Sequence, residues 1–476
     1  MILLLVPPKI MNIDRDIGTN QLTVPGGLAY IAGYLKKNGV HVAVLDAQAE
    51  KLTLTQMVSR IQSLKPDIVG IGIHCSVQIN EAHAAARAVK EISKNIPVIV
   101  GGSHPSAIPE KTLTDHEYFD FIVTGEGEVT AHELYARLKN KTPYDSLEGI
   151  AFRANDGNIT INKPRPYIED LDTLPFPAFE LFPLTRYKPY FASGKHTREL
   201  PVTTARGCPS KCFFCYQPMS DAVRMRSVKN VIEELHYLTE RFGVNQILFT
   251  DDTFTLNIER IHNFCDTLRD QGLHKKIQWL CASRVDIISQ DLLRKMRASG
   301  CTCITYGVES GNQDILDKIK KNITLEQARK AVQWTKEAKI RADVNFILGL
   351  PFENEKTIRD TQKFMLSLDS DFVNIALLAV FPGTRAQEMA EKHVGGLKFI
   401  NQDWYKAGRI VGNMVELEQL PRAKLEFFQT QAYMKFYLRP RKIKNLIRKV
   451  DLKTLCHYCL HQIKTHITYW KRTVHQ

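Results

Sequence analysis

The sequence predicts an α/β protein with a doubly wound, flavodoxin-like N-terminal domain, a partial (β/α)6 barrel and a helical C-terminal extension. Short apolar runs alternate with helical patterns over about residues 1–140, and a second series of this kind begins at about residue 200. The 476 residues also exceed what one hydrophobic core organises. We expect an N-terminal domain over 1–145, a connector over 146–195, a barrel over 196–390 and an extension over 391–476.

The N-terminal series has the pattern of a parallel sheet. The apolar runs ILLLV, VAVLDA, DIVGIGI, PVIVGG and FDFIVTGEGE are separated by helical segments, and continuous apolar runs are typical of strands buried on both faces. Ligands of such sheets lie beyond the carboxyl ends of the strands. Small or turn-forming residues follow several runs, and they form either tight turns or a ligand-binding edge. The candidates are Ser76, Gly101, Gly102, Gly125, Glu126 and Gly127.

The second series contains six strand candidates, which are PVTTA, QILFTDD, IQWLCASR, CITYGVE, DVNFILGLP and VNIALLAVF. Six βα units predict a partial barrel, whose chemistry lies at the carboxyl ends of its strands. Between the two series, LEGIAFRANDGNITINKP predicts a hairpin around Asp156 and Gly157. The proline-rich stretch after it predicts a linker or a lid.

Three cysteines on the loop after the first barrel strand have the spacing of a metal-binding group. Cys208, Cys212 and Cys215 form a CxxxCxxC pattern, and their three thiolates can bind one metal centre. Structural zinc usually takes four ligands, and no nearby Cys or His completes such a set. Iron–sulfur clusters are bound by thiolates, and three thiolates leave one iron free. The pattern favours an iron–sulfur cluster over zinc or over incidental core cysteines.

The composition favours an ordinary enzyme of a reducing compartment. Hydrophobic residues at 44% and charged residues at 24% are near the averages for globular proteins. The apolar start MILLLVPP is too short for a signal peptide, and no apolar window is long enough for a membrane span. Ten cysteines without an export signal indicate reduced thiols or metal ligands. We therefore expect a cytoplasmic protein.

The net charge of +13 is concentrated near the C-terminus, where residues 435–449 contain seven basic residues and no acid. The sequence shows no RNA-binding module, which argues against nucleic acid as a partner. The stretch predicts a basic amphipathic helix, either packed on the barrel or docked on the inner face of a membrane. Five of the seven surround apolar residues at helical spacing, and these are Arg441, Lys442, Lys444, Arg448 and Lys449.

The cysteine motif, with Phe214 directly before its last cysteine, resembles that of radical S-adenosylmethionine (SAM) enzymes. The resemblance implies a [4Fe–4S] cluster on the three cysteines, SAM on the free iron, and a reducing electron donor such as flavodoxin or ferredoxin. It further implies that reductive cleavage of SAM gives a 5′-deoxyadenosyl radical.

Residues at the ends of the later strands match the SAM contacts of that family. The resemblance implies that Asp251 and Asp252 bind the amino group of SAM and that Arg284 binds its carboxylate. It also implies that Glu309 and Ser310 bind the ribose hydroxyls, and that Gly349 lies beside the adenine. The aromatic residue of the motif, Phe214, belongs to the same SAM site. The usual Gly-Gly-Glu after the second barrel strand is replaced here by FTDDTF. The amino-group contact therefore departs most from the family pattern.

The N-terminal phrases VPGGLAYIAGYLKKNG, VGGSHPSAIPE and VTGEGE resemble the cobalamin-binding domain of one radical SAM subfamily. The cobalamin motif DxHxxG is absent, and His104 is expected to be a loop histidine and not a cobalt ligand. The resemblance implies cobalamin as a third cofactor and C-methylation of an unactivated carbon of an apolar small molecule, such as a lipid, hopanoid or tetrapyrrole. Radical cyclisation, oxidation or rearrangement of such a substrate is the first alternative, and RNA modification is the second.

Overall fold

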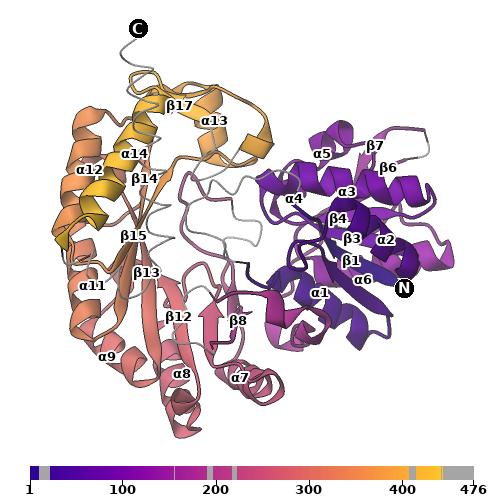
Figure 1. Ribbon diagram of the computed structural model, residues 1–476, viewed down its shortest axis with the longest axis horizontal. Helices are drawn as coiled ribbons and strands as arrows, with labels where there is room; N and C mark the ends of the chain where they lie inside the picture. Colours follow the sequence, from indigo (N-terminus) through magenta and orange to yellow (C-terminus); the bar gives the residue numbers. More distant parts are fainter. Residues whose placement is uncertain are drawn as a thin grey trace.

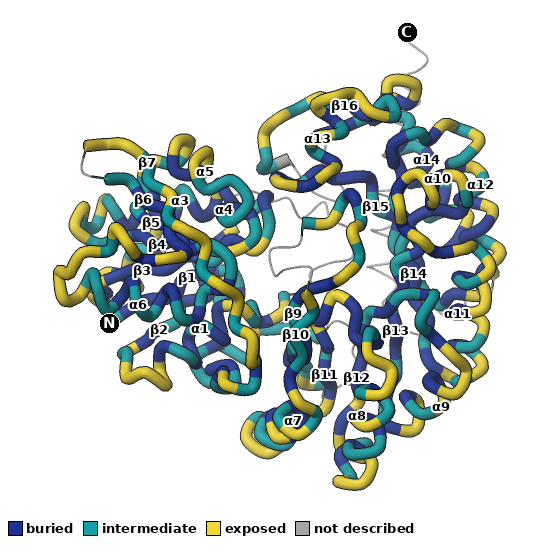
Figure 2. The backbone as a smooth tube through the Cα atoms, turned by 180° about the vertical axis from the view of Figure 1, so that it is seen from behind, coloured by how far each residue is buried: buried dark blue, intermediate teal, exposed yellow. Residues whose placement is uncertain are grey.

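A computed structural model shows two α/β lobes side by side, with the C-terminal helix packed on the second (Figure 1). The buried residues form the sheets and the inner faces of the helices, while the exposed residues lie on the outer surface (Figure 2). The structure describes residues 1–9, 22–154, 156–189, 197–216, 222–406, 414–440 and 442.

The first lobe is built on a seven-stranded sheet with the order β2-β1-β3-β4-β5-β6-β7. Its first five strands are parallel, which confirms the predicted flavodoxin-like sheet. The strands are β1 (Ile2–Val6), β2 (Val42–Asp46), β3 (Ile68–Gly72), β4 (Val98–Gly101), β5 (Phe121–Val123), β6 (Ile150–Arg153) and β7 (Ile159–Ile161). Because β6 pairs antiparallel with β5, the predicted hairpin extends this sheet.

Helices cover both faces of the first sheet. The helices are α1 (Gly26–Lys37), α2 (Leu54–Leu64), α3 (Ile79–Ile92), α4 (Ser103–Ala107), α5 (Pro109–Asp115) and α6 (Gly127–Asn140). Side chains alternate along β1, so Leu3 and Leu5 pack in the cluster that contains α2 and α3, whereas Ile2 and Leu4 pack in the one that contains α1 and α6.

The second lobe is an open barrel of six parallel strands in the order β15-β14-β13-β12-β11-β8. All six predicted strands are present, as β8 (Glu199–Val202), β11 (Gln246–Phe249), β12 (Gln278–Ser283), β13 (Cys301–Glu309), β14 (Arg341–Leu348) and β15 (Phe372–Leu377). Helices cover the outside of this sheet (Figure 1), as α7 (Val228–Phe242), α8 (Ile258–Asp270), α9 (Gln290–Ala298), α10 (Gln313–Lys318), α11 (Leu325–Glu337) and α12 (Glu355–Ser367).

The edge strand β15 is covered by α14 (Arg422–Tyr437), which follows α13 (Arg385–Glu391) and the hairpin of β16 (Leu397–Phe399) and β17 (Val415–Leu417). The hydroxyl of Tyr433 accepts a hydrogen bond from the Ile375 amide at 2.9 Å and donates to its carbonyl at 3.2 Å. Tyr437 makes the same pair of bonds with Val373. These hydroxyls satisfy edge groups that would otherwise lack strand partners.

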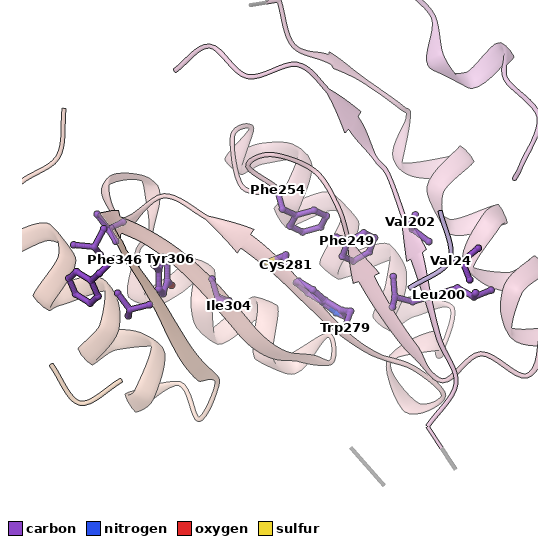
Figure 3. Packing of buried hydrophobic residues seen from close by; sticks show 14 of the residues in the cluster. Val24, Leu200, Val202, Phe249, Phe254, Trp279, Cys281, Ile304, Tyr306 and Phe346 are labelled. Atoms are coloured by element: carbon purple, nitrogen blue, oxygen red, sulfur yellow. The ribbon is translucent and has the colours of Figure 1, made fainter. Parts of the chain in front are cut away.

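The hydrophobic core is continuous between the two lobes. Val24, which precedes α1, belongs to the same buried cluster as Leu200 and Val202 of β8, and the three lie close together in Figure 3. Deeper in the barrel, the rings of Phe249 and Phe254 stack with their centroids 4.4 Å apart. The lobes are thus joined by apolar packing as well as by the ion pairs described below.

None of the helices in the described ranges combines the length and the hydrophobicity of a membrane span. Of the predicted basic amphipathic stretch, residues 435–437 form the end of α14, and the part beyond residue 440 lies outside the described residues except for Lys442. The ammonium of Lys442 donates to the Ser370 carbonyl at the base of the barrel lobe's last helix–strand turn.

Candidate active site

The carboxyl ends of the six parallel strands form one mouth, and the predicted SAM residues follow these ends. The cysteine loop enters from β8 through the short strand β9 (Ala205–Arg206) and, after the loop, the chain continues into β10 (Arg224–Met225). Because β9 and β10 pair antiparallel, they form the neck of the loop.

The three motif cysteines share the loop above this neck. Cys208 is buried, Cys212 is half-buried and Cys215 is exposed. The Cys215 amide donates to the Cys212 carbonyl at 3.1 Å, which turns the loop back on itself. A hydrogen bond from the Cys215 thiol and the nearby charge of Lys321 lower the pKa of the Cys212 thiol to about 6. The same hydrogen bond and burial raise the pKa of the Cys215 thiol, so the loop favours the thiolate, the form that binds a metal, at Cys212.

This donor set fits a cluster better than a single ion. No three His, Cys, Asp or Glu side chains in the described part of the chain are arranged around one ion site. In a cubane cluster each thiolate binds a different iron, so the three sulfurs need not converge on one point. The cations Arg284 and Lys321 both lie close enough to Cys212 to act on its charge, which suits a thiolate-rich, negatively charged group.

Around the cluster loop the structure brings together Phe214, Arg284 and Glu309. Arg284 donates to the Ser210 hydroxyl at 3.1 Å within the cysteine motif, and Asp286 accepts from its Nε and Nη2 at 3.0 and 2.9 Å. Glu309 is buried at the end of β13 with a φ of 72°. A left-handed backbone at a non-glycine residue is uncommon, and such strain is concentrated at functional sites.

Lys321 links these groups and was missed by the sequence reasoning. Its ammonium donates to Glu309 Oε1 at 2.9 Å and lies 5.8 Å from the centroid of the Phe214 ring. Its side chain is only 9% exposed. The sequence KIKKN is typical of exposed lysines after a helix. Nothing in it predicts that Lys321, unlike the other lysines of this run, is buried.

Two other predicted SAM residues, Asp251 and Ser310, make their hydrogen bonds with neighbouring side chains or backbone of the barrel. The carboxylate of Asp251 accepts from the Thr204 amide and hydroxyl at 2.6 and 2.5 Å, so it fixes the end of β8. The Ser310 hydroxyl lies 3.2 Å from that of Thr361. Asp252, by contrast, is exposed at the barrel mouth, where the surrounding protein still raises the pKa of its carboxyl group.

The candidate cobalamin residues lie at the carboxyl edge of β3, β4 and β5. The hydroxyl of Ser76 lies 2.9 Å from Nδ1 of the buried His104, and burial lowers the pKa of His104 to about 4. Gly102 has a φ of 114°, and a Cβ there would lie 2.3 Å from the Ile73 carbonyl. Gly125 has a φ of 70°, and a Cβ there would meet no atom within 4 Å, so its backbone borders open space.

This edge fits a large ligand that needs close backbone approach. The Gly125 amide donates a hydrogen bond to the Ser106 hydroxyl at 3.1 Å, and Gly101 and Gly127 flank the same loops. Glu126 is different, since its carboxylate accepts from Arg206 and Arg224 of the cysteine-loop neck. Although burial alone would raise it, hydrogen bonds from Arg224 and Arg206 hold the pKa of Glu126 below its ordinary value.

The carboxyl group of Glu353 fixes the backbone of the turn at Gly349 by hydrogen bonds. It is fully buried, and its Oε2 accepts from the amides of Gly349 and Leu350 at 2.8 and 3.0 Å. Its Oε1 has no hydrogen-bond partner among the described residues. Burial raises the pKa of Glu353 to about 8, so the carboxyl group is largely protonated at neutral pH.

We expect Glu353→Gln to change how stability depends on pH. From about pH 5 to 8 the unfolded wild-type chain loses a proton that the folded chain keeps, so its free energy of unfolding falls by up to about 1.4 kcal/mol per pH unit. Glutamine retains an acceptor for the two amides and does not titrate. The variant should therefore become progressively more stable than the wild type as pH rises, measured by urea denaturation of the apoprotein.

The control is Glu355→Gln, on the first turn of α12. Hydrogen bonds from Lys424 and Arg359 lower the pKa of Glu355, so it stays ionised in both states over this range. The stability difference from the wild type should then be constant from pH 5 to 8. A constant difference for Glu353→Gln as well would contradict the burial argument.

Comparisons with known proteins agree with this arrangement of two lobes. The radical SAM superfamily matches residues 202–365, and the B12 binding domain matches residues 19–135. An uncharacterized methyltransferase from Pyrococcus horikoshii is 34% identical over 445 residues, which cover 92% of this chain and 93% of the relative. An anaerobic magnesium-protoporphyrin IX monomethyl ester cyclase from Rubrivivax gelatinosus is 30% identical over 77% of this chain and 66% of its own length.

Two solved structures share the fold. The radical SAM methyltransferase TsrM from Kitasatospora setae, with cobalamin and a [4Fe–4S] cluster bound, aligns with a TM-score of 0.69 at 18% identity, covering 90% of this chain and 84% of TsrM. The cobalamin-dependent SAM radical enzyme OxsB, with aqua-cobalamin bound, aligns with a TM-score of 0.74 at 17% identity, covering 98% of this chain and 72% of OxsB.

The two lobes and their facing loops define a cobalamin-binding domain joined to a radical SAM barrel. The chain belongs to the cobalamin-dependent radical SAM enzymes, as its sequence motifs predict. Its cofactors are a [4Fe–4S] cluster, SAM and cobalamin.

Proposed function

We propose that this enzyme transfers a methyl group to an unactivated carbon of an apolar small molecule. The observation that carries the proposal is that the neck of the cysteine loop lies against the cobalamin edge, through the contacts of Arg206 and Arg224 with Glu126. This contact joins the cysteine loop to the candidate cobalamin edge, as a reaction that uses both cofactors requires. When bound, the three cofactors supply hydrogen abstraction from carbon and a transferable methyl group.

The residues of the chain would hold these cofactors as follows. The cysteines 208, 212 and 215 bind the cluster, and Asp252, Arg284 and Glu309 orient SAM by its amino, carboxylate and ribose groups. The backbone of Gly349 and the ring of Phe214 border the nucleoside. Cobalamin rests on the edge formed by Ser76, Gly101, Gly102, Gly125 and Gly127. Lys321 places a positive charge between the cluster loop and the carboxylate of Glu309, to which it donates a hydrogen bond.

The name of the Pyrococcus horikoshii relative supports methyl transfer, and its similarity extends over both lobes. The similarity to a magnesium-protoporphyrin ester cyclase favours one alternative, a radical cyclisation or oxidation of a related apolar substrate. Both reactions require an electron donor that reduces the cluster, and a reduced flavodoxin or ferredoxin could serve as this donor.

The two reactions differ in what they leave of SAM. Methylation should yield one S-adenosylhomocysteine and one 5′-deoxyadenosine per turnover, whereas cyclisation or oxidation should yield 5′-deoxyadenosine alone. The reconstituted full chain is incubated anaerobically with a reductant, SAM bearing a deuterated methyl group, and lipid and pigment extracts of a strain that lacks the gene. Mass spectrometry then follows both nucleosides and any metabolite that gains a deuterated methyl group.

Equal amounts of the two nucleosides with a methylated metabolite are the expected result. Omitting cobalamin is the control and should abolish S-adenosylhomocysteine formation. The appearance of 5′-deoxyadenosine with a changed but unmethylated metabolite would replace the proposal by the cyclase alternative.

A further inference from the structure

Two arginines at the neck of the cysteine loop bind two acids at the cobalamin edge. Arg206 donates from Nη1 to Glu126 Oε1 at 2.7 Å and from Nη2 to Glu128 Oε1 at 2.5 Å. Arg224 donates from Nη1 to Glu126 Oε2 at 2.8 Å. The four side chains are each 10% exposed or less, so this cluster, which we call the interlobe clamp, is buried.

The interlobe clamp includes one arginine from each end of the cysteine loop. Arg206 and Arg224 are directly paired across β9 and β10, and Cys208 follows Arg206 by two residues. All residues of the cysteine motif therefore lie on a loop that leaves and re-enters through this one point.

On the other side, the clamp holds the loop that follows β5. Glu126 and Glu128 flank Gly127, the first residue of α6, next to the open backbone of Gly125. Glu126 also accepts from the Ile168 amide at 2.7 Å, and Arg224 donates to the Ile168 carbonyl at 2.7 Å, which ties the connector to the same cluster.

The geometry of the clamp is restrictive. The planar guanidinium of Arg206 bridges two carboxylates, and its charge lies 5.3 Å from the centroid of the Tyr30 ring of α1. Buried charges are costly without their partners, so neither lobe can shift far without breaking several contacts at once. Surface ion pairs would leave the lobes much freer.

We propose that Glu126 and Glu128 are positioning residues, which set the distance and orientation of the cluster loop relative to the cobalamin edge. This inference rests on the proposed function only in taking the two cofactor sites as partners in one reaction. Neither acid needs to contact a cofactor for this role. Loss of the clamp should therefore loosen the cysteine loop and separate the sites without removing the cluster ligands.

The first test uses the full chain without cofactors. Hydrogen–deuterium exchange is measured for Glu126→Gln and for the control Glu133→Gln, which lies on the same helix but pairs with Arg165 of the connector. We expect exchange in residues 207–216 to rise about tenfold in Glu126→Gln and to stay at the wild-type rate in the control. Exchange in β13 should not change in either variant.

The second test uses the enzyme reconstituted with its cluster and cob(II)alamin. Iron and sulfide contents of Glu126→Gln should match the wild type. The reduced cluster should speed the electron-spin relaxation of cob(II)alamin in the wild type and less so in the variant, as measured by microwave power saturation. Should Glu126→Gln not fold, Glu128→Gln removes only one of the three ion pairs and is measured instead.

Two outcomes overturn the inference. One is wild-type exchange in residues 207–216 together with wild-type spin relaxation. The other is exchange that rises equally in β13, which would show a general loss of stability and not a local release. If the exchange result is as expected but no S-adenosylhomocysteine is formed by the wild type, the clamp stands and the proposed methyl transfer fails.

Discussion

Replacing Cys208, Cys212 and Cys215 together with alanine is expected to abolish binding of the iron–sulfur cluster and formation of 5′-deoxyadenosine. The three thiols are the only cysteines of the loop at the barrel mouth, and a cubane cluster has no other protein ligand in this motif. Iron and sulfide content, visible absorption after anaerobic reconstitution, and nucleoside chromatography measure the effect. All three signals should fall to background.

The matched control is Cys265→Ala, which removes a buried thiol of α8 outside the motif. It should keep the full cluster and lose only the modest stability expected for a small core truncation, about 1 kcal/mol. Cobalamin binding should survive in the triple variant, because its candidate site lies in the other lobe. A triple variant that still bound a cluster and cleaved SAM would refute the assignment of these ligands.

The strands were predictable because each is a continuous apolar run bounded by turn residues. The structure contains a strand at runs such as ILLLV, which is buried on both faces, and VNIALLAVF, where alternate residues of β15 are buried. The place of the hairpin β6–β7 was not predictable in the same way. Its own residues predict two strands and a turn, but its pairing with β5 depends on contacts distant in sequence.

The candidate site shows the same division. The cysteine motif is visible because its spacing is short and local. The direction of a single side chain is not, and so Asp251 and Asp252 look equivalent in sequence although one binds Thr204 and the other is exposed. The sequence GEGE likewise resembles a ligand-binding loop, while Arg206, one of the partners of Glu126, lies 80 residues further along the chain.

Lys321→Met is expected to lower the free energy of unfolding by about 3–5 kcal/mol and to abolish SAM cleavage. The change removes the cation that lies 2.9 Å from Glu309 and leaves that carboxylate buried at a backbone position with a φ of 72°. It also removes the positive charge that most lowers the pKa of the Cys212 thiol. Denaturant titration of the apoprotein measures the first effect, and 5′-deoxyadenosine formation by the reconstituted enzyme measures the second.

The surface control is Lys330→Met on α11, whose partner Glu326 is 63% exposed and whose loss should cost at most about 1 kcal/mol. The double variant Glu309→Gln/Lys321→Met separates the two roles of the buried pair. Because it removes both charges, it should regain most of the stability lost by Lys321→Met, yet it should not regain SAM cleavage. The single variant Glu309→Gln completes the comparison: if its stability loss and that of Lys321→Met simply added in the double variant, Glu309 and Lys321 would not be energetically coupled. Recovery of SAM cleavage along with stability would mean that the pair supports only the fold, and that neither residue orients SAM.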